Sequence, residues 1–153
     1  MNIHVDDFIR QLSSKAPVPG GGGASALIGA VGVSLCSMVA NLTSGKKKYA
    51  EYQKDIEAVI RRAQASTDRL INLIAKDAEV FAPLSAAYGI PKDDPQRAAK
   101  LEKALLAASA VPLEILTEVS SVLDIIEELT VKGTRIAISD VGVAASACRS
   151  AME

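Results

Sequence analysis

The sequence has 153 residues, of which 49% are apolar and 23% are charged. This length and balance are typical of one packed domain and exclude intrinsic disorder over most of the chain. A net charge of −1 and an aromatic content of 3% offer little to nucleic acid or to an anionic membrane. Two cysteines and one histidine exclude a disulfide framework and a multi-histidine metal site. We therefore expect a cytoplasmic protein with no metal, nucleic-acid or membrane partner.

The N-terminal segment predicts a short amphipathic helix followed by a break. Apolar residues between Val5 and Leu12 follow the helical period. Two aspartates in the same segment argue against a signal peptide. Residues 15–23 contain two prolines and end in four glycines, a composition that disfavours regular structure.

Residues 24–43 carry no charge and are long enough to span a bilayer. They also form two stripes with helical spacing, which we expect to pack closely against another backbone on one side and to face a side-chain core on the other. Because the other predicted helices are amphipathic and charged, a buried helix of a soluble protein is favoured over a membrane span. The first stripe holds the small residues Ser25, Gly29, Gly32 and Cys36, and the second holds the bulky residues Ile28, Val31, Leu35, Met38 and Leu42.

Two long helical faces follow in the sequence. The first covers residues 49–82, and the helix is expected to kink or end at Pro83. The second is expected to start at Asp94, an N-cap residue that is followed by a proline suited to the first helical position. It ends at Gly133, with a kink expected at Pro112.

A last helix starts near Val141 and continues to the end of the sequence. No stretch alternates apolar and polar residues over the length of a strand. The chain therefore predicts an all-α fold in a single domain over residues 1–153. We expect a bundle of long amphipathic helices around a buried central helix rich in small residues. Bundles of this kind often complete their core by dimerising.

Four consecutive glycines, Gly20, Gly21, Gly22 and Gly23, lead into the charge-free helix. Their backbone N–H groups stand at the positive end of a helix dipole, where a carboxylate or a phosphate can bind. No Gly-Lys-Ser/Thr follows and no strand precedes, so the run is neither a P-loop nor a dinucleotide motif. The alternative is a hinge that lets two backbones pass.

Lys46, Lys47 and Lys48 form a basic run after the same helix. In one interpretation they are a solvated helix end, with cations where the dipole favours them. In the other they attract an anionic ligand. The two interpretations are compatible.

Asp77 falls in register with Leu70, Ile74 and Phe81, on the face that should be buried. A buried carboxylate loses hydration and must find a partner or hold a proton more tightly than usual, which is how general acids and bases arise. The alternative is a carboxylate that is bonded to a lysine or to the backbone of a neighbouring helix.

Several other polar residues have a structural interpretation beside the functional one. Asp140 fits a capping or dipole-paired residue at the start of the last helix. Asn41 fits a buried amide between two helices, and Ser25 belongs to the small stripe. Cys36 and Cys148 are expected in the core.

Three motifs, PVPGGGGASALIGAVG, MVANLTSGKKKY and SDVGVAA, together resemble the cyclodeaminase domain of formiminotransferase-cyclodeaminase. The same family includes stand-alone bacterial methenyltetrahydrofolate cyclohydrolases, and the resemblance runs over essentially the whole chain, including FAPLSAAYGIPK. It implies an all-α homodimer that binds a folate substrate and makes or opens the one-carbon bridge between N5 and N10, without a metal or redox cofactor. The alternative is a non-catalytic helical dimer that binds folate or serves as a scaffold.

The resemblance also implies roles for the candidate residues. Asp77 and Asp140 would form the acid/base pair, and Asn41 would orient the substrate. Pterin or glutamate groups would be bound by the glycine run and Ser25. The tail carboxylates of folate would be attracted by Lys46, Lys47 and Lys48.

Two departures from the family pattern affect these expectations. Gly23 stands where such proteins often have serine, which removes a hydroxyl near the ligand. Such proteins also usually continue with the rest of a C-terminal helix beyond the position of Glu153.

Overall fold

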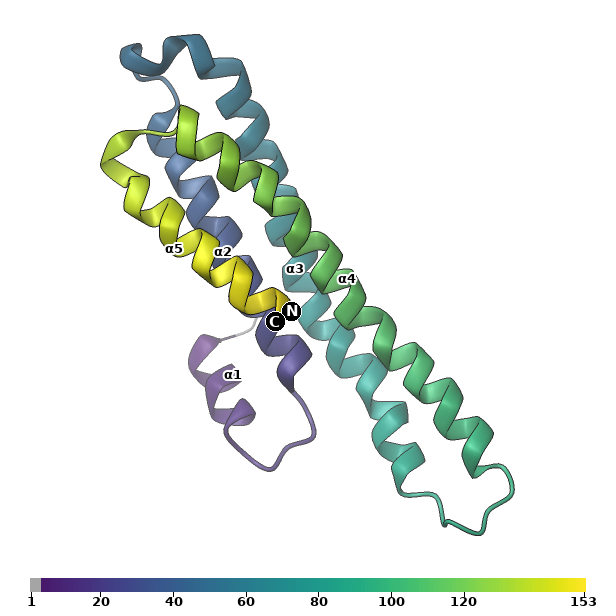
Figure 1. Cartoon of the computed structure of the whole chain (residues 1–153). Helices are drawn as coiled ribbons and strands as arrows, with labels where there is room; N and C mark the ends of the chain where they lie inside the picture. Colours follow the sequence, from purple (N-terminus) through teal and green to yellow (C-terminus); the bar gives the residue numbers. More distant parts are fainter. Residues whose placement is uncertain (1–3) are drawn as a thin grey trace.

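The computed structural model describes residues 4–153 (Figure 1). In this range the chain is helical and contains no strand, which confirms the all-α prediction. The α-helices are α1 (Val5–Leu12), α2 (Gly21–Thr43), α3 (Gln53–Tyr88), α4 (Arg97–Lys132) and α5 (Ile138–Met152). Two 3-10 turns, η1 (Lys47–Tyr52) and η2 (Arg135–Ala137), follow α2 and α4 respectively.

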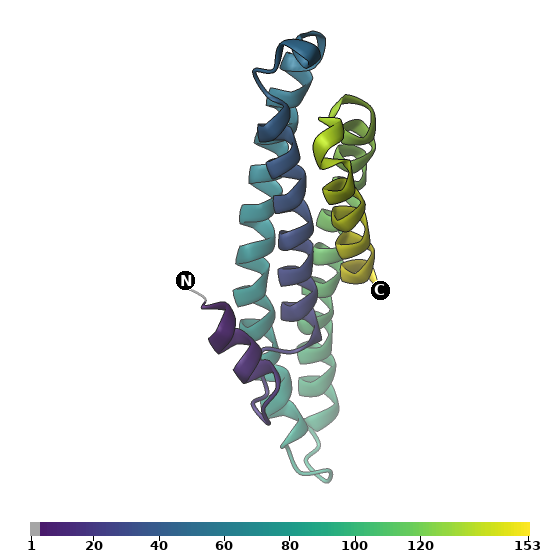
Figure 2. The same ribbon diagram turned by 90° about the vertical axis from the view of Figure 1, so that its left-hand side faces the viewer.

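The long helices α3 and α4 form an antiparallel hairpin, and α2 and α5 lie along its upper part (Figure 1). Turned by 90°, the bundle shows α2 beside α3, and α5 in front of α4 (Figure 2). One core cluster joins these four helices and includes Phe8 of α1. A smaller cluster of Leu84, Ala87 and Ala104 holds the far end of the hairpin.

The small stripe of α2 packs against α5, as predicted. A Cβ atom on Gly32 would lie 2.9 Å from the Cys148 sulfur and 3.1 Å from the Ala144 carbonyl oxygen. These separations are shorter than ordinary van der Waals contact, so the two helices meet over their backbones. Cys36 and Cys148 are fully buried, and burial raises the pKa of their thiols to about 12 and about 11. Both thiols are therefore protonated and act as small core residues.

Four of the five residues in the bulky stripe of α2 do not face a core, so the prediction is wrong for them, whereas Leu35 is half-buried and packs against the core cluster. Ile28, Val31, Met38 and Leu42 are between 39% and 52% exposed and form an apolar strip along the helix. The neighbouring helices α3 and α5 cover the sides of α2 that carry small residues, because only small side chains let them approach. The larger side chains are left on the side that no other described element covers.

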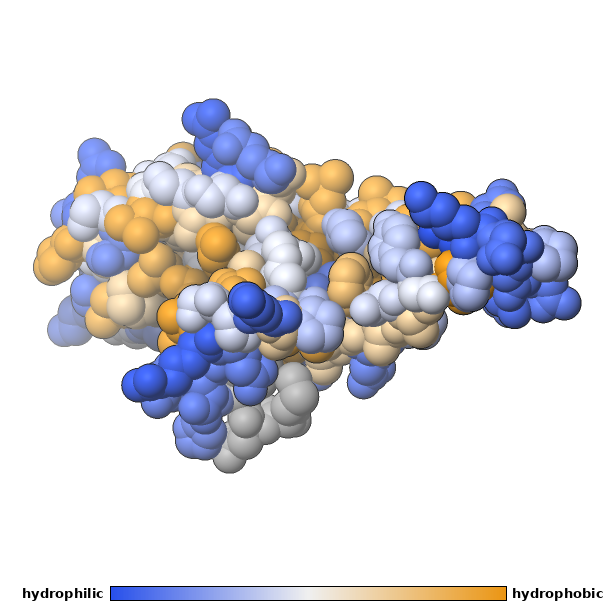
Figure 3. Space-filling view, turned by 90° about the horizontal axis from the view of Figure 1, so that it is seen from below, coloured by the Kyte–Doolittle hydropathy of each residue, from blue (hydrophilic) through white to orange (hydrophobic). Residues whose placement is uncertain are grey.

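Both α2 and α4 are long and apolar enough to cross a membrane when they are judged by length and composition alone. The most apolar window of α2 is 50% buried inside the bundle, whereas that of α4 is 22% buried. Apolar side chains therefore reach the surface along both helices. Figure 3 shows hydrophobic patches over much of the underside, while the loop between α3 and α4, at the right-hand end, is hydrophilic.

Three helices extend further than the sequence predicts, and one of them, α5, begins at Ile138 instead of near Val141. α2 begins at Gly21, because the glycines form its first turn instead of a separate loop. α3 continues through Pro83 to Tyr88. Packing of its last turns against α4 in the smaller core cluster outweighs the hydrogen bond that the proline removes.

The start of α4 also differs from the prediction. The helix begins at Arg97 because the Asp94 carboxylate accepts the N–H of Gln96 within a preceding turn. The prediction that α4 passes through Pro112 and ends at Gly133 is confirmed.

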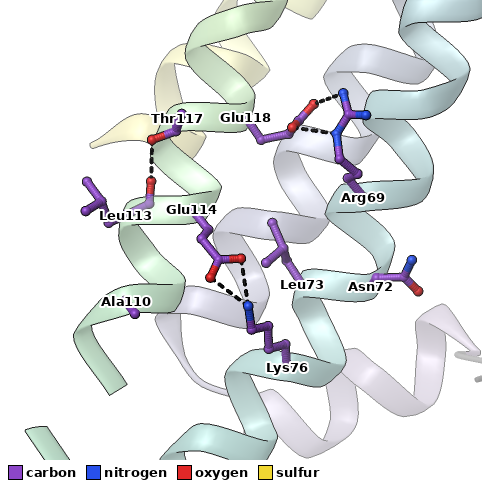
Figure 4. A pocket seen from close by; sticks show the side chains of 9 residues that line it. All are labelled: Arg69, Asn72, Leu73, Lys76, Ala110, Leu113, Glu114, Thr117 and Glu118. Atoms are coloured by element: carbon purple, nitrogen blue, oxygen red, sulfur yellow. Dashed lines mark hydrogen bonds and ion pairs between the residues drawn. The ribbon is translucent and has the colours of Figure 1, made fainter. Parts of the chain in front are cut away.

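Ion pairs join the two long helices of the hairpin (Figure 4). The Arg69 guanidinium donates to both oxygens of the Glu118 carboxylate, at 2.6 and 2.8 Å, and Lys76 donates to Glu114 at 2.6 Å. Burial acts to raise the pKa of Glu118, but hydrogen bonds from Arg69 and Ser66 outweigh it and lower the pKa. The bidentate pair therefore stabilises the charged carboxylate between α3 and α4.

We expect Gly32→Ala to destabilise the fold by about 1–3 kcal/mol, since the new methyl group would press on the Cys148 sulfur and the Ala144 backbone. Gly142→Ala in α5 is the matched control, because nothing lies within 4 Å of a Cβ atom at that position. Replacing that helical glycine should stabilise the fold by about 0.5–1 kcal/mol. Urea unfolding followed by circular dichroism measures both changes. Equal effects would contradict the close packing of α2 on α5.

Glu118→Gln should lower the free energy of unfolding by about 1 kcal/mol at pH 7, because the ion pair with Arg69 is lost. A carboxylate with a lowered pKa contributes fully above its unfolded value and loses this contribution as the pH falls through its folded value. The difference between wild type and variant should therefore shrink below the usual glutamate value of about 4.3. An undiminished difference at lower pH would show that the ion pair is not its cause.

Candidate functional site

The start of α2 and the adjacent part of α3 form a polar cluster, the glycine end of the bundle. Asp77 of α3 reaches the first turn of α2, where its Oδ2 accepts the backbone N–H of Gly23 at 2.9 Å. A Cβ atom on Gly22 would overlap the same carboxylate, so this approach requires glycine. The carboxylate lies at the positive end of the α2 dipole, which stabilises its negative charge.

The Asp77 carboxylate is bonded to the backbone of a neighbouring helix, which confirms the structural alternative given for this residue. The carboxylate uses one donor of the first turn, and the N–H of Ala24 is bonded to the Gly20 carbonyl. The N–H groups of Gly21 and Gly22 remain as the donors that this helix end can offer to a ligand. The prediction that the glycine run disfavours regular structure is wrong, because Gly21 to Gly23 are helical.

Gly22 and Ser25 line a cavity of about 390 Å³ between α2, α4 and the end of α5. Its other walls are α4 residues from Pro112 to Leu116 and the last residues of α5. Sites for small molecules commonly have volumes from about 300 to 1,000 Å³. Gly20 and Gly21 have open space where a Cβ atom would be. The structure thus places Gly22 and Ser25 at this cavity, whereas Asp77 meets Gly22 from α3 and is not among the residues that line the cavity.

The end of α2, η1 and η2 form a second polar cluster, the basic end. Lys46, Lys47 and Lys48 are exposed there, and the Lys46 ammonium donates to the Thr134 hydroxyl at 3.2 Å. The Thr134 N–H donates in turn to the Thr43 hydroxyl at 2.8 Å, and both threonines are buried. These bonds fix the lysine turn to the turn that precedes α5.

Tyr49 belongs to the basic end and was not among the candidates from the sequence. Its hydroxyl oxygen accepts the backbone N–H of Arg135 at 3.1 Å, and the Lys48 ammonium lies 5.6 Å from the centre of its ring. The Arg135 N–H, the Thr134 hydroxyl and the ammonium groups of Lys48 and Lys46 lower the pKa of Tyr49. The one signal in the sequence is its place directly after the three lysines.

Asn41 and Asp140 also lie toward the basic end. Asn41 is exposed, and its amide donates to the Ser37 carbonyl of the same helix at 2.8 Å. The prediction of a buried amide between helices is wrong, because no other described helix covers this side of α2. Asp140 is half-buried in the first turn of α5, where the dipole favours a carboxylate, and no side-chain hydrogen bond caps this helix.

The glycine end and the basic end lie about 30 Å apart along α2, at 1.5 Å per residue. α5 runs antiparallel to α2, since Ala151 lies beside Gly29 and Ala144 beside Gly32. The start of α5, with Asp140, therefore lies beside the basic end. One copy of the chain does not bring Asp77 and Asp140 together, so the predicted acid/base pair is not assembled within it.

A larger cavity of about 680 Å³ lies between α3 and α4 and contains none of the predicted site residues (Figure 4). Four of its charged side chains are paired with each other, Arg69 with Glu118 and Lys76 with Glu114. These side chains neutralise one another and offer no unpaired charge to a ligand, so the glycine end is the better candidate. Among residues 4–153, no group of three or more His, Cys, Asp or Glu side chains is placed to hold a metal ion.

Comparison with known proteins connects the chain to one family. The family model described as formiminotransferase-cyclodeaminase matches residues 4–153. A methenyltetrahydrofolate cyclohydrolase from Methylorubrum extorquens is 43% identical over 147 residues, which cover 94% of this chain and 71% of that protein. A formimidoyltransferase-cyclodeaminase from Mus musculus is 33% identical over 144 residues, which cover 92% of this chain and 27% of that protein.

A solved structure has the same arrangement of helices. The crystal structure of a formiminotetrahydrofolate cyclodeaminase from Thermotoga maritima matches with a TM-score of 0.88 and 28% sequence identity, over 97% of this chain and 72% of that one. Sequence and fold therefore agree over nearly the whole length of the chain. This chain belongs to the formiminotransferase-cyclodeaminase family.

Proposed function

We propose that this chain is a soluble, cytoplasmic enzyme that acts on the one-carbon bridge between N5 and N10 of tetrahydrofolate. The family match over residues 4–153 carries the proposal, because the relatives are named for two reactions at this bridge. One reaction closes 5-formiminotetrahydrofolate to 5,10-methenyltetrahydrofolate and releases ammonia. The other hydrolyses the methenyl bridge. The folate is the substrate, and the proposal includes no further cofactor.

Both reactions need proton transfer beside a positively charged carbon. Ring closure requires N10 to attack the formimino carbon while ammonia leaves with an added proton. Hydrolysis requires water to attack the methenyl carbon and to lose a proton. A carboxylate can carry that proton, and as an anion it also stabilises the cationic bridge. Asp77 suits this role because the Gly23 N–H holds Oδ2, while Oδ1 lies over Gly22, which is one of the residues that line the cavity.

The apolar strip of α2 supports a homodimer. Its exposed side chains, Ile28, Val31, Met38 and Leu42, gain stability when a second copy covers them. In a dimer whose two-fold axis is perpendicular to α2 and passes near the middle of the strip, α2 packs antiparallel against α2 of the second copy. Each glycine end then lies beside the basic end of the partner subunit.

This dimer assembles one site from two copies. One copy contributes Asp77, Ser25 and the glycine run, and the second contributes Asn41, Asp140 and the three lysines. We assign the two aspartates to proton transfer and Asn41 to orienting the substrate. The glycine run and Ser25 bind pterin or glutamate groups, and the lysines attract the tail carboxylates.

A non-catalytic folate-binding dimer is the second candidate. It is favoured by the bond between Asp77 and Gly23, which also gives the carboxylate a structural role at the start of α2. Thermal unfolding with 5-formyltetrahydrofolate separates the two candidates when it is combined with the turnover assay. Stabilisation without turnover supports binding alone.

The purified protein should convert 5-formiminotetrahydrofolate or 5,10-methenyltetrahydrofolate in an absorbance assay. Asp77→Asn should reduce kcat by about 10²–10⁴-fold, the usual contribution of a general acid or base, while the amide oxygen still accepts the Gly23 N–H. Asp68→Asn, at an exposed position of α3, is the control and should leave kcat unchanged. No turnover of either folate would refute the activity. Full activity of a folded Asp77→Asn protein would remove Asp77 from the mechanism.

Subunit mixing tests whether the site takes one aspartate from each copy. Asp77→Asn and Asp140→Asn chains that are unfolded together and refolded should form mixed dimers in which one of the two sites has both aspartates. Random pairing should restore about a quarter of the wild-type activity, because half of the dimers are mixed and half of their sites are intact. Each variant refolded alone is the control. No recovery from the mixture would contradict the shared site.

A further inference from the structure

The basic end carries positive charge that the chain does not neutralise. Among residues 4–153, Lys46, Lys47 and Lys48 take part in no ion pair. Lys46 is held by a neutral group, the Thr134 hydroxyl, which leaves its charge uncompensated. A cluster of cations without acidic partners attracts an anion.

Tyr49 adds a directional donor to this cluster. Its Oη accepts the Arg135 N–H at 3.1 Å, which holds the oxygen in place and leaves the phenol proton to be donated. The Lys48 ammonium lies 5.6 Å from the ring centre, so a positive charge stands over the same side chain. A neutral O–H donor among ammonium groups is well suited to a carboxylate, which accepts several hydrogen bonds at once.

The cluster is built before any ligand arrives. The bond from the Thr134 N–H to the Thr43 hydroxyl is buried and joins the end of α2 to η2. The Thr134 hydroxyl also accepts a hydrogen bond from the Lys46 ammonium, and the backbone N–H of the neighbouring Arg135 donates to the Tyr49 hydroxyl. The donors are therefore fixed from two separate parts of the chain, while Tyr49 is only partly buried and the lysines are exposed to a ligand.

We propose that Tyr49 is a further substrate-binding residue whose hydroxyl donates a hydrogen bond to a carboxylate of the folate tail, beside the ammonium groups of Lys46 and Lys48. The inference rests on the proposed function, since it names the group that meets the tail of that substrate. The pterin then lies toward Asp77 of the partner subunit, at the other side of the shared site.

Ionisation of Tyr49 reports on this contact. A bound carboxylate places a negative charge beside the phenol, which disfavours the phenolate and raises the pKa of Tyr49. By linkage, binding weakens as the pH rises through the pKa of Tyr49 in the free protein. The charged groups that act on the phenol are the ammonium groups of Lys48 and Lys46, and both lower its pKa.

Nuclear magnetic resonance of ¹³Cζ-labelled tyrosine measures this shift, since the chain has three tyrosines and no tryptophan. Tyr49→Phe assigns the Tyr49 signal. N-(4-aminobenzoyl)-L-glutamate, the folate tail without the pterin, should raise the pKa of Tyr49. At the same ionic strength 4-aminobenzamide, which lacks the carboxylates, should leave the pKa unchanged. The signal of Tyr88, exposed at the far end of the hairpin, is the internal control.

Binding and kinetics provide the second readout. Tyr49→Phe should weaken the binding of 5-formyltetrahydrofolate about tenfold or more in calorimetry, as expected for a lost hydrogen bond to a charged group. It should raise KM by a similar factor and change kcat less than about twofold, because the contact is far from the reacting carbon. Tyr88→Phe, the same change at an exposed position, should alter neither value.

The outcomes separate this inference from the proposed function. An unchanged pKa of Tyr49 with the tail fragment, or wild-type affinity of Tyr49→Phe, overturns the inference even when turnover is normal. A carboxylate-dependent shift of Tyr49 together with no turnover of either folate refutes the enzyme and leaves the carboxylate site in place.

Discussion

The close approach of α2 and α5 is the constraint on which the other features of the molecule depend. Gly32 lies against the Ala144 carbonyl and the Cys148 sulfur, and Gly29 lies against Ala151. Since small side chains are used where the helices meet, the bulky side chains of α2 are left on its opposite side. Exposed apolar surface is unfavourable by roughly 25 cal/mol per Å². The packing that completes one chain therefore creates a surface that favours a second one.

At the glycine end, the absence of a Cβ atom on Gly22 makes room for a carboxylate instead of for another helix. Gly22 lets the Asp77 carboxylate of α3 reach the first turn of α2, where a backbone N–H and the helix dipole stabilise its charge. The same contact fixes the register of α3 along α2 and sets the orientation of the carboxylate. Asp77 therefore affects both the packing of α2 on α3 and the chemistry of the proposed site. Asp77→Asn is the best test, because it keeps the hydrogen bond from the Gly23 N–H while it removes the charge.

The helices were predictable from sequence because apolar periodicity depends on local spacing. α1 and the end of α4 at Gly133 match the prediction to the residue. The predicted helix ends are wrong where tertiary packing overrides a local rule, as at Pro83, which lies inside α3. The prediction that the exposed face of α2 is buried is wrong for another reason. Hydropathy shows which side chains avoid water but not which chain covers them. Val31 and its neighbours were assigned to a core that one copy does not contain.

The candidate site also has residues that the sequence identifies and residues that it does not. Asp77 could be found because a carboxylate on an apolar face breaks a pattern, and the structure gives it the partner that this position required. Tyr49 breaks no pattern, and its role depends on the N–H of Arg135, which is far away in the sequence. The distance between Asp77 and Asp140 could not be predicted from the sequence either, because it depends on the direction in which α5 returns along α2.

That direction decides how the site can be completed. Side chains cannot bridge a separation of about 30 Å along one helix, so a single chain does not assemble the candidate residues into one site. In the proposed dimer, antiparallel pairing of α2 across a two-fold axis joins each half to its complement and buries the apolar strip in the same step. Activity of the proposed dimer depends on protomer concentration, since dissociation separates the two halves of each site. In the proposed dimer, the charge-free helix α2 holds the two copies together and separates the two sites.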